Sequence, residues 1–351
     1  MTDFWTRQHA KNCACGACNL PNLLELLGEG KKRVNLIGGF LGSGKTTMVN
    51  NILSQPLNQR IDVIVKEFGS ISVDDKLMSI SKDRIHPFTG AAMHTDQQTM
   101  LINFLDALYG KSEQHPFDHL LIEASGAESA EQLLQIFYLP RTRDCYELGS
   151  YICVVDGEFG SLNLHEFRIA REQTAFADFL IVNKCDRVGK EELAALEREL
   201  RIINPFAEII ETSFGEVDAS AIIVPDSVTQ LRSIDFDRQE DETVEGFQSI
   251  AIRISEPLDM EKVNAWIRET YDQYGKKLLR GKGYFNIAGS DYRFDFQSVR
   301  TNFHAKTEDE WNPDEERESV VVFIGAELPD KEQLEAGLLA CAASETERKS
   351  A

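Results

Sequence analysis

The chain has 351 residues, of which 42% are hydrophobic and 27% charged, a composition suited to about two folded domains. Acidic residues outnumber basic ones by 58 to 37, and the formal net charge is −21. A surface this acidic repels nucleic-acid phosphates and anionic lipids, so we expect neither nucleic acid nor a membrane as partner. The first residues do not resemble a leader, and no apolar run reaches the ~20 residues that span a bilayer, so we expect a cytoplasmic protein.

The first motif along the chain is a cluster of metal-binding residue types. Three of the seven cysteines, Cys13, Cys15 and Cys18, lie close together with His9 upstream. The odd count and the scatter of the other four argue against a disulfide framework. A Cys₃His set is common for tetrahedral Zn²⁺, and thiolates also suit Co²⁺ or part of an iron–sulfur cluster. We predict that residues 1–30 are a metal-binding tail; the alternative is a tail of reduced cysteines without a role.

Short apolar segments alternate with helical ones over residues 31–234, which predicts an α/β domain with a mostly parallel sheet. The expected strands are Arg33–Ile37, Ile61–Val65, His119–Glu123, Tyr151–Asp156, Phe179–Asn183 and Glu208–Glu211. The expected helices include Thr47–Leu53, Gln97–Leu108 and Glu191–Ile203.

An acidic segment, residues 235–246, reads as a solvated linker to a smaller α+β domain over residues 247–343, with a short tail at 344–351. The second domain is expected to contain strands Ser249–Ile254 and Val320–Ile324, a hairpin over Tyr284–Phe296, helices Met260–Tyr274 and Asp330–Leu339, and a charged loop at Thr307–Glu318.

The strongest motif is Gly39-x-x-x-x-Gly44-Lys45-Thr46, which lies between an apolar strand and a helix. Glycines let backbone N–H groups surround phosphates, the lysine reaches the β- and γ-phosphates, and the threonine hydroxyl ligates Mg²⁺. The alternative is a glycine-rich turn that matches by chance. The residues predicted to bind nucleotide phosphates are Gly39, Gly42, Ser43, Gly44, Lys45, Thr46 and Thr47.

A second motif indicates which base is bound. Asn183-Lys184-x-Asp186 follows an apolar strand. The carboxylate of Asp186 can accept hydrogen bonds from guanine N1–H and the exocyclic amine, which adenine cannot offer. Lys184 would lay its aliphatic stem along the base, and Asn183 would connect this loop to the phosphate loop. The motif therefore favours GTP over ATP, although the same four residues also occur as an ordinary strand-to-helix turn.

Two acidic residues lie at or just after the ends of predicted strands. Glu123 is placed to hold Mg²⁺ together with Thr46, and Glu67 is placed to sense the nucleotide or bind metal. The structural alternatives are a helix N-terminal carboxylate for Glu123 and a surface acid for Glu67. We predict that Lys45, Glu67 and Glu123 form the catalytic group.

Taken together, these motifs resemble those of the CobW-type P-loop GTPases, which are related to the nickel-insertion GTPases of hydrogenase and urease maturation. The resemblance extends from Arg33 to Cys341. Beyond the two loops above it is carried by Val63–Gly69, Glu123–Gly126, Val155–Asp156, Asn204–Pro205, Gly215–Asp218, Leu278–Gly283, Gln297–Val299 and Val321–Gly325.

The resemblance implies a P-loop GTPase that handles a transition metal for a client enzyme. The family's internal metal loop reads Gly-Cys-x-Cys-Cys, but Ala91, Met93 and His94 occupy its three cysteine positions here. Because alanine offers no ligand, that site is not carried over intact. The fourth ligand of the tail cluster is left open between His9, a second chain, and Glu67 or His94.

The sequence therefore predicts a slow GTPase that couples nucleotide state to metal or metallocofactor delivery. Its partner would be a client metalloenzyme or a corrinoid or other cofactor protein, and the resemblance makes a homodimer plausible. Two alternatives remain: a G-protein chaperone that gates such a partner without binding metal, and a nucleotide-dependent phosphotransferase or ligase acting on a small molecule.

Overall fold

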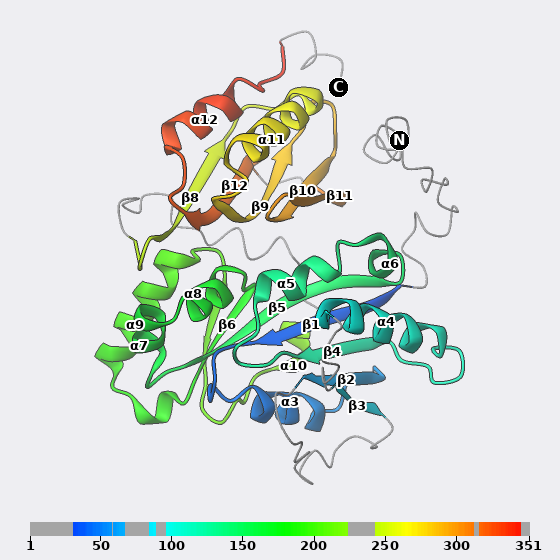
Figure 1. The fold of residues 1–351 in the computed structure, drawn as a ribbon. Helices are drawn as coiled ribbons and strands as arrows, with labels where there is room; N and C mark the ends of the chain where they lie inside the picture. Colours follow the sequence, from blue (N-terminus) through cyan, green and yellow to red (C-terminus); the bar gives the residue numbers. More distant parts are fainter. Residues whose placement is uncertain are drawn as a thin grey trace.

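The computed structural model describes residues 31–57, 59–66, 84–88, 96–223, 243–311 and 316–344, with only the backbone of residues 303–309. The first domain is built on a seven-stranded sheet in the order β3-β2-β4-β1-β5-β6-β7, in which every neighbouring pair is parallel (Figure 1). Its strands are β1 (Lys32–Gly38), β2 (Ile61–Lys66), β3 (Ile85–Phe88), β4 (His119–Glu123), β5 (Tyr146–Asp156), β6 (Phe179–Asn183) and β7 (Glu208–Glu211).

Helices cover both faces of this sheet. They are α3 (Lys45–Ser54), α4 (Gln97–Gly110), α5 (Ala130–Ile136), α6 (Pro140–Arg143), α7 (Gly160–Glu166), α8 (Arg168–Ala175), α9 (Lys190–Ile203) and α10 (Ala219–Ile223). Side chains alternate along each strand: Leu36 of β1 packs in the core under α4, α5, α8 and α9, whereas Ile37 packs in the core under α3 and α10. Strands buried on both faces must be apolar throughout, which explains their unbroken hydrophobic runs.

The second domain carries an antiparallel sheet in the order β11-β10-β9-β12-β8, with two helices packed in its core. Its elements are β8 (Phe247–Ile254), α11 (Met260–Tyr274), β9 (Leu278–Asn286), β10 (Tyr292–Val299), β11 (Asn302–Glu310), β12 (Ser319–Ala326) and α12 (Lys331–Leu339). Asp259 and Asp330 begin the two helices by accepting hydrogen bonds from backbone N–H groups of the first turn. The predicted fold class, a parallel α/β domain followed by a smaller α+β domain, is confirmed.

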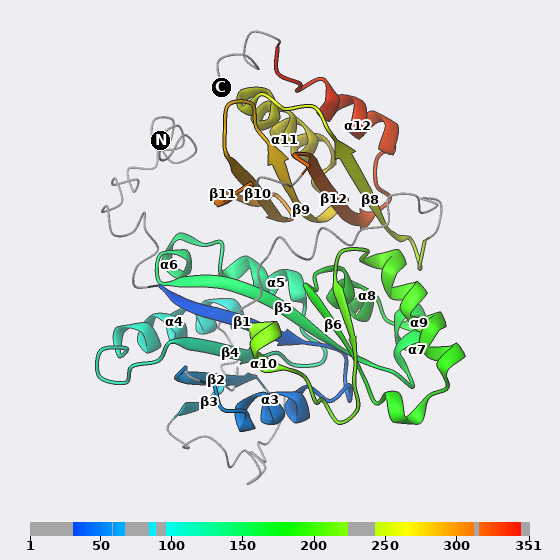
Figure 2. The ribbon, with the colours of Figure 1, turned by 180° about the vertical axis from the view of Figure 1, so that it is seen from behind.

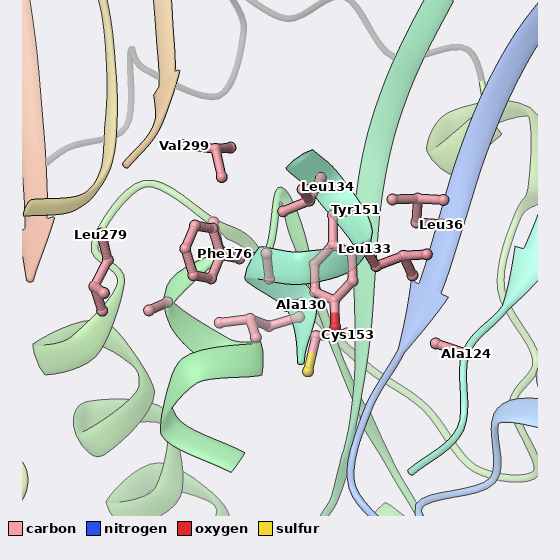
Figure 3. Packing of buried hydrophobic residues seen from close by; sticks show 14 of the residues in the cluster. Leu36, Ala124, Ala130, Leu133, Leu134, Tyr151, Cys153, Phe176, Leu279 and Val299 are labelled. Carbon is pink, nitrogen blue, oxygen red and sulfur yellow. The ribbon is translucent and has the colours of Figure 1, made fainter. Parts of the chain in front are cut away.

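The two domains share a continuous apolar contact. Figures 1 and 2 show the second domain stacked on the side of the first that carries α5 and α8. In Figure 3, Leu279 and Val299 of the second domain lie beside Leu134 and Phe176 of the first. These residues belong to one buried hydrophobic cluster, so the interface contains an apolar core contact.

A buried ionic cluster lies at the same interface. Arg280 and Lys282, both on β9, reach Asp178 with nitrogen-to-oxygen distances of 2.5 and 3.1 Å. The other Asp178 oxygen accepts the backbone N–H of Tyr151. Burial alone would raise the pKa of Asp178, but the two cations hold it below its ordinary value.

Two sequence-based assignments differ from the structure. Residues 307–310, predicted as part of a charged loop, belong to β11, which pairs with β10 at the edge of the sheet. Edge strands often carry charged side chains, which discourage pairing with another chain at the open edge. The short strand β3 was not predicted, since Pro87 weakens its strand pattern; an edge position tolerates that proline.

The domain limits stay a prediction. Residues 235–242 of the expected linker lie outside the described part of the chain, and Val244 is already buried and paired with Phe247. Cys145, Cys153, Cys185 and Cys341 are free thiols in the described residues. Among those same residues, every helix is too short or too polar to cross a membrane.

Candidate nucleotide site

Those predicted nucleotide-site residues that the structure describes come together at one edge of the parallel sheet. The carboxyl ends of β1, β4, β5 and β6 meet there, and they deliver the phosphate loop, Glu123, Asp156 and Asn183 respectively. Ligands of open parallel sheets bind at this edge because the loops that leave the strands diverge around it.

The phosphate loop turns sharply between β1 and α3. Gly39, Gly42 and Gly44 all have positive φ angles, of 132°, 75° and 104°. A Cβ atom at Gly39 would lie 2.2 Å from the Val154 carbonyl oxygen, and one at Gly44 would lie 2.3 Å from Nδ2 of Asn183. Only glycine fits these positions, so the loop keeps its backbone close to the neighbouring strands.

Lys45, the first residue of α3, folds back over its own loop. Its Nζ donates hydrogen bonds to the carbonyl oxygens of Gly39 at 2.8 Å and Phe40 at 3.2 Å. Burial lowers the pKa of Lys45, and the negative charge of Glu123 partly opposes that shift. Ser43 Oγ is buried without a hydrogen-bond partner among the described residues, which suits a polar ligand in the loop.

A possible Mg²⁺ position follows from two oxygen-bearing side chains. Thr46 Oγ1 donates a 2.6 Å hydrogen bond to Glu123 Oε1, and Glu123 is 5% exposed. A hydroxyl and a carboxylate in contact form the hard oxygen donor set that Mg²⁺ prefers beside phosphates. The residues present therefore fit this ion.

The predicted guanine-reading loop, Asn183–Asp186, is attached to the phosphate loop through two of its residues. Asn183 Nδ2 donates to the Ser43 carbonyl at 2.9 Å, and Lys184 Nζ donates to the Gly42 carbonyl at 2.7 Å. Asp186 lies at the exposed rim, within a short 3₁₀ turn. The four-residue motif and the phosphate loop, far apart in sequence, are thus joined directly by hydrogen bonds.

Asp156 is a site residue that the sequence marked only as part of a family pattern. Its Oδ2 lies 2.6 Å from Lys184 Nζ, and its Oδ1 accepts the backbone N–H groups of Glu158 and Phe159. The sequence signal that could have identified Asp156 as a site residue is its position at the end of an apolar strand. Lys184 itself has a left-handed backbone conformation (φ 64°).

A second group of unpredicted contacts comes from the loop between β7 and α10. Ser213 Oγ accepts the Asp186 backbone N–H at 3.1 Å, and the Gly215 N–H donates to Asn183 Oδ1 at 2.9 Å. Because these contacts join separate strands, no local sequence pattern revealed them.

Lys66, at the end of β2, forms a largely buried ion pair with Glu128, which follows β4. Lys66 Nζ also lies 5.6 Å from the centre of the Phe88 ring. This pair joins β2 to the turn that leaves Glu123.

The residues predicted to bind a transition metal lie outside the described part of the chain: His9, Cys13, Cys15, Cys18, Glu67 and His94. Within the described ranges, no group of three or more His, Cys, Asp or Glu side chains is arranged to hold a metal ion.

Comparison with known families decides the relationship. The CobW/HypB/UreG nucleotide-binding domain matches residues 33–211, and the CobW C-terminal domain matches residues 247–342. The chain belongs to this family. The resemblance drawn from the motifs is thereby confirmed, and the predicted class of function, a GTPase of the metallochaperone type, is that of the family.

Individual relatives cover nearly the whole chain. The zinc chaperone YjiA of Escherichia coli is 30% identical over 313 residues, covering 85% of this chain and 95% of YjiA. The zinc chaperone CobW of Pseudomonas aeruginosa is 27% identical, covering 92% and 93%. The crystal structure of Zn(II)-bound YjiA GTPase from E. coli aligns with a TM-score of 0.68 at 26% identity, covering 89% of this chain and 99% of that one.

Proposed function

We propose that this chain is a GTPase metallochaperone. It would bind GTP with Mg²⁺ at the carboxyl edge of the first sheet, hydrolyse GTP slowly, and couple the nucleotide state to delivery of a transition metal to a client protein. The observation that carries the proposal is the direct hydrogen bonding of the guanine-reading loop to the phosphate loop, from Asn183 to Ser43 and from Lys184 to Gly42. Zinc is the first candidate metal, because the relatives in E. coli and P. aeruginosa are named zinc chaperones.

In the proposed site, Lys45 would exchange its two backbone carbonyl acceptors for β- and γ-phosphate oxygens. The exchange keeps the buried ammonium hydrogen-bonded throughout, so it leaves no charge unpaired. Thr46 and Glu123 would hold Mg²⁺, which when bound neutralises phosphate charge. Glu123, and Glu67 beyond the described residues, would orient the attacking water.

Base selection would come from Asp186, whose exposed position leaves its carboxylate accessible to guanine. Asn183 supports this role through two bonds, one to the phosphate loop and one from Gly215. The loop is therefore held in place before nucleotide arrives, which reduces the ordering cost of binding.

Metal binding would use Cys13, Cys15 and Cys18 with His9 as the proposed fourth ligand, since Ala91, Met93 and His94 replace the family's internal cysteines. The client would be a metalloenzyme or cofactor protein that receives the metal. A homodimer and a cytoplasmic location complete the proposal.

The decisive test measures metal content and nucleotide turnover in the same preparations. Elemental analysis of anaerobically purified protein should find zinc or another transition metal in wild type and in Cys145→Ala, whose thiol is outside the tail. The Cys13→Ala, Cys15→Ala, Cys18→Ala triple variant should lose that metal while keeping its affinity for GTP. Retention of the metal by the triple variant, or its absence from wild type, contradicts the tail site.

Nucleotide turnover separates the proposed GTPase from the other classes. GTP hydrolysis by wild type should exceed ATP hydrolysis and should need no small-molecule acceptor, and Lys45→Ala should abolish it. Hydrolysis that depends on an added metabolite would instead support a phosphotransferase. Metal-free wild type whose GTPase is stimulated only by a partner would support a gating chaperone.

A further inference from the structure

One aromatic residue stands exposed beside the guanine-reading loop. Phe214 follows β7, and 64% of its surface is accessible. A single exposed apolar residue is ordinary on a protein surface and by itself carries no conclusion. Its backbone and its neighbours, however, set this residue apart.

The backbone of Phe214 is held in an unfavourable conformation. Its φ angle is 60°, and the next residue, Gly215, has a φ of 68°. Left-handed conformations are rare for bulky side chains and cost free energy, so they persist only where surrounding contacts impose them. Gly215 packs closely against α3, because a Cβ there would lie 2.9 Å from backbone atoms of Met48.

Three hydrogen bonds impose this conformation, and two of them come from the guanine-reading loop itself. The Phe214 carbonyl accepts Nδ2 of Asn51, in α3, at 2.6 Å. On either side, Ser213 Oγ accepts the Asp186 N–H, and the Gly215 N–H donates to Asn183. The backbone that carries the exposed ring is thus held against the loop with the predicted base-reading carboxylate and against the helix that follows the phosphate loop.

We propose that the Phe214 ring is a stacking surface for the guanine base. This inference rests on the proposed GTP site and adds a residue to it. Asp186 would discriminate between bases by hydrogen bonding, the stem of Lys184 would line one side, and Phe214 would supply base-tolerant contact area. Stacking on an aromatic ring works for every base, because each has a π-face. Phe214 therefore contributes affinity, whereas Asp186 contributes selectivity.

The test compares equilibrium binding of GTP, ITP and inorganic tripolyphosphate, each with Mg²⁺, to Phe214→Gly, Phe214→Trp and wild type. Glycine adopts a φ of 60° without strain, so this variant removes the ring while preserving the turn. Phe214→Gly should bind GTP and ITP about tenfold more weakly, a loss within the range of one base–aromatic stack. Affinity for tripolyphosphate should stay unchanged, and Phe214→Trp should restore GTP binding.

Tyr292→Ala, which removes an exposed aromatic residue of the second domain, is the matched control and should bind all three ligands as wild type does. Wild-type affinity for GTP in Phe214→Gly overturns the stacking role and leaves the GTP site intact. An equal loss for tripolyphosphate also overturns it, because the loop and not the ring would then be at fault. Failure of wild type to bind GTP would instead refute the proposed function.

Discussion

Polar side chains in this molecule occur in two settings with opposite consequences. At the carboxyl edge of the parallel sheet, Glu123 and Asp156 end their strands, and Lys45 begins the helix that follows the phosphate loop. Away from that edge, Asp178 and His119 are enclosed by protein and bonded to fixed partners. The same residue types thus serve a binding site in one place and hold elements together in the other.

The two settings differ in the partners to which the charged side chains are bonded. Lys45 is bonded to carbonyls of its own loop, which phosphate oxygens can replace. Arg280 and Lys282 are bonded to a carboxylate of the other domain, and no ligand reaches them without separating the domains. Changes at the edge should therefore alter binding and leave stability intact, whereas changes in the interior should do the reverse.

Asp178→Ala should give the largest effect. It leaves Arg280 and Lys282 without their buried counter-charge, and losing one partner of such a cluster costs about 3–5 kcal/mol of unfolding free energy. Denaturant unfolding measures this cost. GTP affinity of the folded variant should remain within about twofold, since Asp178 lies at the start of β6 and the guanine-reading loop at its end.

A matched control replaces the whole cluster. Asp178→Asn with Arg280→Met and Lys282→Met removes all three charges while keeping an acceptor for the Tyr151 N–H. It should recover most of the stability, because well-packed apolar groups substitute for buried ion clusters. Two results for Asp178→Ala would contradict the distinction between the binding edge and the interior: stability equal to wild type, or a loss of GTP affinity in proportion to the loss of stability.

The buried ring of His119 should make the free energy of unfolding depend on pH. The ring lies 1% exposed, with Nε2 2.6 Å from the Asn35 amide, and burial together with nearby Arg33 lowers its pKa to about 4. An unfolded histidine titrates near 6.5, so between these values the unfolded chain binds the extra proton. Stability is therefore full above about pH 6.5 and falls as pH drops towards 4, by up to about 3 kcal/mol from this group.

Comparison of unfolding free energies at pH 7 and pH 4 for wild type and His119→Gln isolates that contribution from the carboxylates. The variant should lose less stability on acidification than wild type does. His165→Gln serves as the control, because His165 is half exposed and its ring donates hydrogen bonds to the carboxylates of Glu245 and Glu199, which raise its pKa and give a small effect of opposite sign. Parallel pH profiles for wild type and His119→Gln would refute a neutral buried ring.

The first domain was predictable largely because its signals are local. An unbroken apolar run fixes each central strand, and the phosphate loop and Asn183–Asp186 are contiguous motifs. Strands such as β4 and β6 match their predicted limits for that reason. The edge strand β11 reads as a charged loop, since its pairing with β10 is a tertiary property.

Contacts between distant segments could not be predicted from the sequence either, because they too depend on the tertiary fold. The Asp156–Lys184 pair and the hydrogen bonds of Ser213 and Gly215 depend on which strands lie side by side, and a single sequence does not state that order. The buried charges of β9 were visible in the sequence, but their partner, Asp178, lies a hundred residues earlier. The residue types therefore indicated the kind of interaction, and only the fold showed which residues contact one another.

Asp186→Asn should give the smallest and most selective effect. Replacing the carboxylate by an amide removes one acceptor facing guanine and supplies a donor that suits the additional carbonyl of xanthine. The loss for GTP should be about ten- to a hundredfold, as for one or two hydrogen bonds to a charged group, with a gain for XTP. Competition binding of GTP and XTP measures the exchange, and Glu191→Gln, a nearby helix-start carboxylate, is the control.

Because Asp186 is exposed and contributes only its backbone N–H to Ser213, thermal stability should not change. Equal weakening of GTP and XTP would place Asp186 outside the base-reading role and assign selectivity to the surrounding backbone.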